Sequence, residues 1–278
     1  PGSSLELKDA RQDARNGAAK DWCGHHTFPL RRVRSREIVP ELARDEAALW
    51  LSGVCQVRNP RLLQALIQAV KLGGGEIIEY AEVSKLKIEH GRIQSISTSQ
   101  GIEYSADHYI ATAGAWSRQL LGDHALKLDI WPVRGQILLF KVQPDLLKTI
   151  VLQDRDYFYL IPRRDGHILA GSTLEEAGFD KVPTAEARKI LLAHAHALVP
   201  ALTEETVVGH WAGLRPGSPD NIPVIDRHPS IPNLYLNSGH YRYGVTMAPG
   251  SANLLVNMVL NRPQPIDIMP YRWPSSAA

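Results

Sequence analysis

Two kinds of sequence pattern alternate along these 278 residues, and this alternation most constrains the fold. Residues 53–121 carry helix and strand signals typical of an α/β sheet, whereas residues 131–200 carry short alternating strands joined by short connections. Short connections favour antiparallel pairing. We therefore predict an α/β (α+β) fold of two domains, with one domain formed by residues 1–50 and 130–212 and the other by residues 51–129 and 213–278.

The α/β pattern begins with a helix. Asn59-Pro60 is a typical helix start, the following leucines recur at helical spacing, and Gly73-Gly74-Gly75 ends the helix. We predict a strand over residues 76–80, a β-meander over residues 83–89, 92–97 and 102–105, and a buried strand over residues 108–113. Residues 116–121 are expected to form a helical turn. Gly114 and Ala115, at the end of the buried strand, allow a ligand to approach the backbone closely.

The antiparallel part is predicted to contain strands over residues 131–142, 156–161 and 166–172. Thr184 then caps an amphipathic helix that ends near Pro200. Two more strands are predicted at residues 207–211 and 234–237, followed by a glycine-containing loop and a final helix over residues 251–260. In the first 50 residues we expect extended segments and one short helix around residues 9–19.

Composition excludes several classes of function. The formal charge is 31 − 29 = +2 and is spread along the chain, so it gives no support for nucleic-acid binding. The one basic cluster in the sequence, Arg31 to Arg36, is interpreted as a solvated face. Cys23 and Cys55 match no disulfide framework, which favours a reducing cytoplasm. No apolar run reaches the roughly 18 residues of a membrane helix, and the start at Pro1 indicates a fragment.

Motifs of other enzyme classes are missing. The sequence has no G-x-G-x-x-G, no Walker A motif, no H-E-x-x-H, no G-x-S-x-G and no C-x-x-C. The pairs His25-His26 and His194/His196 have no cysteine or carboxylate companions at ligand spacing, so no metal site is predicted. Hydrolase, NTPase and zinc chemistry therefore have no support.

Two arginines lie where α/β proteins commonly bind ligands. Arg215 follows a predicted strand within Gly213-Leu214-Arg215-Pro216-Gly217, and Arg242 lies in the loop from Gly239 to Gly244. An arginine fork binds a carboxylate through two hydrogen bonds and keeps its charge at any physiological pH. The alternative from the residues alone is that both arginines are surface or ion-paired groups.

Several blocks, in order, give the chain a family resemblance. They are Cys55 to Pro60, Ala81 to Val83, Ala111 to Ser117, Pro132 to Gln136, Tyr159 to Pro162, Gly171 to Thr173 with Gly178 to Asp180, and the two arginine motifs. Together they resemble the D-amino-acid oxidase-type FAD oxidoreductases, most closely the glycine oxidases of thiamine biosynthesis.

The resemblance implies a role for each matching residue. It implies that residues 1–50 and 130–212 form a substrate domain and that the remainder binds FAD. Arg215 and Arg242 would hold the substrate carboxylate, and Tyr159 would flank the substrate. The residues implied to contact FAD are Val83, Gly114, Ala115, His240, Tyr241, Arg242, Tyr243, Gly244, Val245 and Thr246.

The implied reaction is FAD-dependent oxidative deamination of glycine or another small amino acid, by hydride transfer to the flavin with dioxygen as oxidant. The implied partners are this small substrate and dioxygen, with no nucleic acid. The family opens with a glycine-rich βαβ unit that is not in this sequence, so we expect that unit to be missing. Surface exposed by its loss would favour a homo-oligomer.

Two other hypotheses stay open. The chain resembles enzymes that act on other amines, so it is alternatively a D-amino-acid dehydrogenase or another secondary-amine oxidase. A cysteinyl-flavin link late in the chain is excluded because no cysteine follows Cys55. The third hypothesis is a truncated, non-catalytic remnant, because the missing unit would supply the helix that holds the FAD pyrophosphate.

Overall fold

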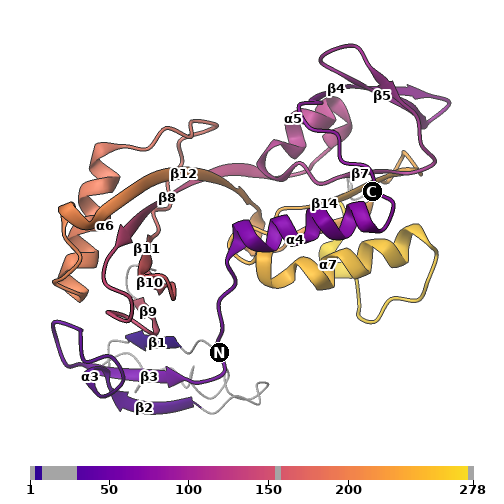
Figure 1. The fold of residues 1–278 in the computed structure, drawn as a ribbon. Helices are drawn as coiled ribbons and strands as arrows, with labels where there is room; N and C mark the ends of the chain where they lie inside the picture. Colours follow the sequence, from indigo (N-terminus) through magenta and orange to yellow (C-terminus); the bar gives the residue numbers. More distant parts are fainter. Residues whose placement is uncertain (1–3, 8–29, 154–157, 275–278) are drawn as a thin grey trace. The chain divides into compact units, whose positions relative to one another are not determined.

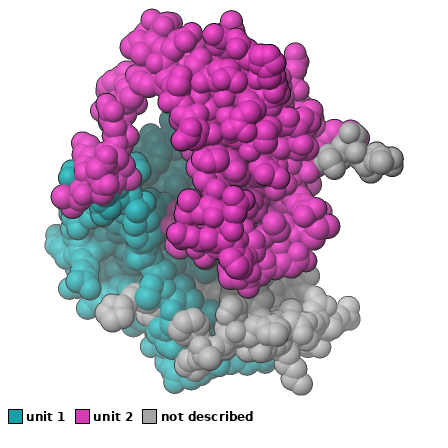
Figure 2. Space-filling view, turned by 90° about the vertical axis from the view of Figure 1, so that its right-hand side faces the viewer, with its two compact units in different colours: residues 1–69, 135–175, 181–213 teal, residues 70–134, 176–180, 214–278 magenta. Residues whose placement is uncertain are grey.

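A computed structural model describes residues 4–7, 30–153 and 158–274. The helix expected around residues 9–19, and Cys23, lie outside the described residues. The chain divides into two compact units, coloured separately in Figure 2: unit 1 comprises residues 1–69, 135–175 and 181–213, and unit 2 comprises residues 70–134, 176–180 and 214–278. The mixture of helices with antiparallel sheets agrees with the predicted α/β (α+β) class. The assignment of the four predicted segments to a substrate domain and an FAD-binding domain remains a prediction.

An eight-stranded sheet runs through unit 1, in the order β12-β8-β11-β10-β9-β1-β3-β2 (Figure 1). Its strands are β1 (Ser4–Leu7), β2 (Leu30–Arg34), β3 (Ala47–Leu51), β8 (Trp131–Lys141), β9 (Ile150–Gln153), β10 (Phe158–Pro162), β11 (His167–Gly171) and β12 (Val207–Gly217). The pairs β8–β11, β11–β10 and β10–β9 are antiparallel, which confirms the antiparallel pairing predicted for this part of the chain. Strand β9 was not predicted, and it pairs parallel with β1. Strands β8 and β12 continue into unit 2.

The core of unit 1 forms where helix α6 (Ala185–Leu198) packs against this sheet. Leu138, Phe140 and Leu160 of the sheet are fully buried, together with Ala195 of the helix. Thr184 caps α6 as predicted, because its hydroxyl accepts a hydrogen bond from the Ala187 N–H at 3.3 Å. A short helix, α3 (Ser35–Ile38), follows β2.

Unit 2 contains two three-stranded sheets. One has the order β13-β14-β7, and the other is the predicted meander β4-β5-β6. The strands are β4 (Val83–Glu89), β5 (Arg92–Thr98), β6 (Glu103–Tyr104), β7 (Tyr109–Ala111), β13 (Val224–Arg227) and β14 (Leu234–Ser238). The buried amide of Asn233 joins them: it donates to the Ile93 carbonyl at 2.8 Å and accepts from the Ile93 N–H at 3.0 Å.

Helices α5 (Ser117–Leu121) and α7 (Gly244–Val259) follow strands of unit 2, and α4 (Asn59–Leu72) links the two units along the chain. Single 3₁₀ turns are η1 (Gly114–Trp116), η2 (Gly122–Ala125), η3 (Glu204–Thr206), η4 (Pro219–Asn221) and η5 (Met269–Tyr271). Helix α4 has the predicted extent, but the Arg58 carbonyl, and not Asn59, makes its first hydrogen bonds, to the N–H groups of Arg61 and Leu62. None of its residues is buried by the described part of the chain.

Two predicted elements were wrong. Residues 76–80 form no strand, because no strand among the described residues pairs with them, and Tyr80 adopts a left-handed conformation with φ of 58°. A strand needs a hydrogen-bonded neighbour, which apolar composition alone does not supply. Helix α7 begins at Gly244, not at residue 251, although Gly250 and Pro249 are poor helix formers. The packing of Leu254 and Leu255 onto Ile225 and Tyr235 outweighs that local preference.

No helix in residues 4–7, 30–153 and 158–274 is long and apolar enough to cross a membrane. Within the same ranges, no group of three or more histidine, cysteine or acidic side chains is placed to hold a metal ion.

Candidate functional site

The carboxyl ends of two parallel strands meet at one edge of the β13-β14-β7 sheet. Strand β7 leads into Gly114 and strand β14 ends at Ser238, with Leu236 opposite Ala111. The Ser117 and Ser238 hydroxyls lie 2.9 Å apart, and both lie within hydrogen-bond distance of the Gly114 carbonyl, at 2.8 and 3.0 Å. This edge therefore brings the predicted small residues Gly114 and Ala115 close to the start of the predicted His240–Thr246 segment.

The backbone of the loop after β14 is tightly shaped. Gly239 has a φ of +83°, where a side chain is strained, and Tyr241 has a φ of 45°. The Tyr243 N–H donates to the His240 carbonyl at 2.9 Å, and α7 starts at the next residue. Residues 244–246, expected to line the flavin from a loop, thus form the first turn of a helix.

This loop is joined to the end of β12, the strand that carries Arg215. The Tyr241 N–H donates to the Pro216 carbonyl at 2.9 Å, and the Ser218 hydroxyl donates to the Gly239 carbonyl at 2.6 Å. Arg215 is half-buried and Arg242 is exposed. The structure therefore places the backbones of the two predicted arginine motifs side by side in unit 2.

Two buried polar atoms close to this loop have no hydrogen-bond partner among the described residues: Nε2 of His240 and Oδ1 of Asn237. Burial lowers the pKa of His240, so its ring is held in the neutral form. A Cβ placed on Gly114, which has a φ of +56°, would meet no atom within 4 Å. The edge thus combines open space with polar atoms that can still bond to a ligand.

Val83 and Tyr159 lie on other elements. Val83 begins β4, opposite Thr98, in the second sheet of unit 2. Tyr159 belongs to β10 of unit 1, opposite Gly171, and a Cβ on Gly171 would come within 2.9 Å of the Tyr159 hydroxyl. The tyrosine ring therefore lies over a glycine of the neighbouring strand. The roles predicted for Val83 and Tyr159 remain predictions.

Sequence reasoning missed two groups of polar residues. Ser117, Ser218 and Ser238 were not singled out, because a serine gives no signal until its neighbours in space are known. The sequence also showed only one basic cluster, Arg31 to Arg36, whereas the structure gathers a second set of cations in unit 1 from three separate segments. Arg31, Arg32, Arg34 and Arg36 are exposed, as the solvated-face interpretation expects.

Comparisons with known proteins agree with this architecture. The sequence profile described as FAD dependent oxidoreductase (DAO) matches residues 3–258. The chain is 44% identical over 258 residues to glycine oxidase of Pseudomonas aeruginosa, covering 91% of this chain and 70% of that protein.

Two solved structures are also similar. Glycine oxidase from Geobacillus kaustophilus has a TM-score of 0.90 and 26% identity, covering all of this chain and 75% of the other. Iminodiacetate oxidase from Chelativorans has a TM-score of 0.85 and 27% identity, covering 97% and 75%.

Proposed function

The chain belongs to the DAO family of FAD dependent oxidoreductases, and on this premise we propose that it oxidatively deaminates glycine or another small amino acid. The membership confirms the predicted family, the oxidoreductase class and FAD as the cofactor. Glycine as substrate is supported by the similarity to the Pseudomonas aeruginosa glycine oxidase. The implied roles of dioxygen as acceptor and of thiamine biosynthesis as pathway, and the cytoplasmic location, belong to the same proposal.

The residues at the β7–β14 edge fit a large planar cofactor. Gly114 leaves open space where a side chain would stand, and Ala115 beside it is small. His240 offers a neutral ring whose buried Nε2 has no partner among the described residues. We assign Gly114, Ala115 and residues 240–246 to contacts with FAD, and Val83 to its adenine end. When bound there, FAD would supply the two-electron oxidant for the substrate amine, with dioxygen as the final electron acceptor.

The proposed work of the protein is to hold and orient the substrate. Arg215 and Arg242 clamp the substrate carboxylate through charge-assisted hydrogen bonds, each worth about 1.5–3 kcal/mol. The single observation that carries this proposal is the hydrogen bond between Tyr241 and Pro216, because it fixes the backbones next to both arginines. Tyr159 is proposed to flank the bound substrate. A neutral amine can lose a hydride without a strong protein base, so orientation and exclusion of water suffice.

An oxygen-consumption assay with glycine and added FAD tests the function. We expect oxygen uptake that saturates with glycine, together with flavin absorbance that stays with the protein through gel filtration. Protein that remains colourless after FAD is added, even at high FAD concentration, would support the third hypothesis, a non-catalytic remnant. Isothermal titration of the same protein with FAD gives the binding constant independently of turnover.

A secondary amine is the second candidate substrate, and the similarity to iminodiacetate oxidase is the observation that favours it. The same assay with iminodiacetate and with sarcosine distinguishes the two proposals. A higher kcat/KM for either secondary amine than for glycine would replace glycine as the proposed substrate. Reduction of a dye without oxygen uptake would instead indicate a dehydrogenase.

A further inference from the structure

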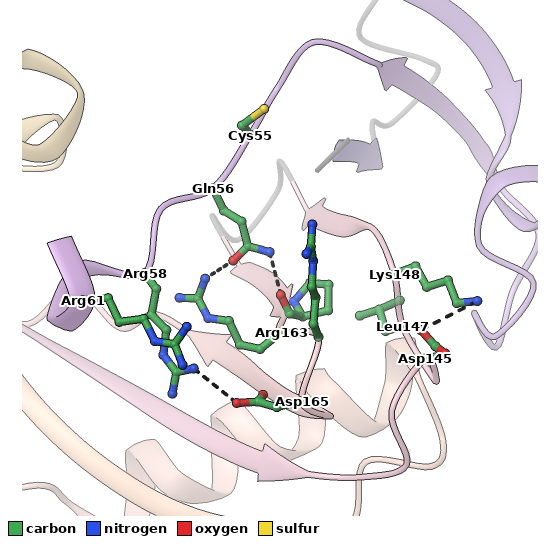
Figure 3. A pocket seen from close by; sticks show the side chains of 11 residues that line it. Cys55, Gln56, Arg58, Arg61, Asp145, Leu147, Lys148, Arg163 and Asp165 are labelled. Atoms are coloured by element: carbon green, nitrogen blue, oxygen red, sulfur yellow. Dashed lines mark hydrogen bonds and ion pairs between the residues drawn. The ribbon is translucent and has the colours of Figure 1, made fainter. Parts of the chain in front are cut away.

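A positively charged pocket of about 700 Å³ lies in unit 1, formed only by residues of that unit (Figure 3). Three segments supply its cations: the start of α4, the loop before β9 and the turn between β10 and β11. These cations are Arg58, Arg61, Lys148, Arg163 and Arg164. Two carboxylates, Asp145 and Asp165, also line it, so the formal charge of the lining is 5 − 2 = +3.

The two carboxylates are already engaged. Asp165 accepts a hydrogen bond from Arg58 at 3.2 Å and lies 2.9 Å from the His167 ring. The His167 contact above all, with Arg58 adding to it, holds the pKa of Asp165 well below its usual range. Asp145 lies 3.8 Å from Lys148, in an exposed pair that contributes little. Among the described residues, neither carboxylate forms an ion pair with Arg61, Arg163 or Arg164.

Arg163 is held in place by a neutral group. Its guanidinium donates to the Gln56 side-chain oxygen, and the Gln56 nitrogen donates to the Pro162 carbonyl at 2.6 Å, as Figure 3 shows. Arg163 is half-buried and makes no direct ion pair among the described residues. This burial, and then repulsion from Arg58, lower the pKa of Arg163, and attraction to Asp165 offsets part of the effect. A desolvated cation in a fixed orientation gains more from an anionic ligand than a solvated one does.

Arg61 and Arg164 have exposed side chains that make no hydrogen bond or ion pair within the described part of the chain. Arg61 lies in the first turn of α4, a 14-residue helix with no acidic residue in that turn. The positive end of the helix dipole therefore adds to the potential near Arg58 and Arg61.

We propose that this pocket binds a small metabolite that carries a diphosphate or two phosphate groups. Its volume lies within the range of about 300–1,000 Å³ found for small-molecule sites. Guanidinium forks match the several oxygens of a phosphate bidentately, and a net charge of +3 suits a ligand with two to four negative charges. The pocket is separate from the residues assigned above to FAD and to the substrate carboxylate, none of which lines it.

Isothermal titration with inorganic pyrophosphate tests the proposal. The protein is kept in excess FAD, so that FAD occupies the site assigned to it above and pyrophosphate is kept out of that site. We expect saturable binding that weakens as sodium chloride is raised from low to physiological concentration, because exposed charges are then screened.

The variant Arg61→Ala/Arg164→Ala tests whether the bound anion occupies this pocket. Both side chains are exposed and unpaired among the described residues, so their loss should not affect folding. We expect pyrophosphate affinity to fall at least about tenfold, since each lost charge-assisted hydrogen bond weakens binding. The variant Arg32→Ala/Lys189→Ala removes two exposed cations of unit 1 outside the pocket and should change affinity less than about twofold.

Three outcomes would overturn the proposal. One is the absence of pyrophosphate binding by the unmodified protein at low salt. Another is an equal loss of affinity in both double variants, which would assign binding to general surface charge. The last is malonate affinity equal to that of pyrophosphate, which would assign the pocket to carboxylates. Flavin absorbance shows whether each variant still binds FAD. If all variants retain FAD, a change in pyrophosphate affinity is not caused by loss of the cofactor.

Discussion

The backbone N–H of Tyr241 donates a hydrogen bond to the carbonyl oxygen of Pro216 at 2.9 Å. Each residue is the immediate neighbour of a predicted substrate-binding arginine: Pro216 follows Arg215, and Tyr241 precedes Arg242. A second bond, from the Ser218 hydroxyl to the Gly239 carbonyl, joins the same two segments. The two arginines are thus attached to two backbone segments that are hydrogen-bonded to each other, which limits how far apart their guanidinium groups can move.

Replacement of Arg215 by alanine tests the clamp. If Arg215 holds the substrate carboxylate, steady-state kinetics should show KM for the amino acid rising about 10- to 150-fold, which corresponds to the loss of 1.5–3 kcal/mol. Arg215→Lys keeps the charge but loses the fork, so an intermediate rise is expected. Arg227→Ala, which removes another arginine of unit 2, is the control and should leave KM unchanged. An unchanged KM in Arg215→Ala would remove this residue from the clamp.

Local patterns predicted most of the fold because the relevant signals lie within a few residues of each other. The cap of Thr184 on α6 and the meander from Val83 to Tyr104 depend on turn and cap chemistry that short segments contain. The parallel pairing of β1 with β9 could not be predicted, because it depends on residues far apart in the chain. The prediction of a strand over residues 76–80 was wrong for the same reason, since apolar composition does not reveal whether a partner strand exists.

The residues of the candidate site could be predicted from the sequence only where they belong to a recognisable motif. Arg215 and Arg242 stood out through their glycine and proline neighbours, and the family resemblance linked them. The hydroxyls of Ser218 and Ser238, which fix the same backbone, have no spacing or composition that distinguishes them from surface serines. The basic pocket of unit 1 was also invisible, because its arginines come from separate segments.

Replacement of Gly239 by alanine should destabilise the site. Gly239 has a φ of +83°, and an added Cβ would lie 3.3 Å from the Ser218 Cβ and 3.4 Å from Ile130. We expect the free energy of unfolding to fall by about 1–3 kcal/mol and FAD affinity to fall with it. Gly213→Ala is the matched control, since its Cβ would meet no atom within 4 Å and its φ is ordinary. Equal melting temperatures for the two variants would contradict the strain argument.

Gln136 of β8 should stabilise the attachment of Thr184, the N-cap of α6, to the sheet. It is fully buried, its nitrogen donates to Glu175 at 2.8 Å, and its oxygen accepts from the Thr184 N–H at 2.8 Å. Gln136→Leu removes both hydrogen bonds, and the Thr184 N–H that loses its acceptor should cost about 1–3 kcal/mol of stability. Urea unfolding measures this loss. Gln143→Leu, at an exposed position in the same unit, should change stability by less than about 0.5 kcal/mol.

His228 should make the stability of unit 2 depend on pH. It is 3% exposed, its Nε2 donates to the His124 carbonyl at 2.8 Å, and its Nδ1 accepts from the N–H groups of Ser230 and Ile231. Burial lowers its pKa in the folded state, only partly offset by the bond to the His124 carbonyl. Because Nδ1 is an acceptor in the fold, protonation would also break two hydrogen bonds.

The sign of the pH effect follows from proton binding. As pH falls below about 6.5, the unfolded chain binds a proton at His228 that the folded chain does not, so acid favours unfolding. The contribution of neutral His228 to the free energy of unfolding is fully present above about pH 6.5. It is lost with a slope of up to about 1.4 kcal/mol per pH unit as the pH falls towards the lowered pKa. Urea unfolding at several pH values between 7.5 and 5 measures this effect. The free energy of unfolding should fall less steeply with decreasing pH in His228→Gln, whose side chain cannot titrate, even though this variant is less stable at the start. His90→Asn, at an exposed turn position with φ of 51° that asparagine tolerates, should keep the slope of the unmodified protein. If His228→Gln and the unmodified protein lost stability in parallel, the acid sensitivity would come from other groups.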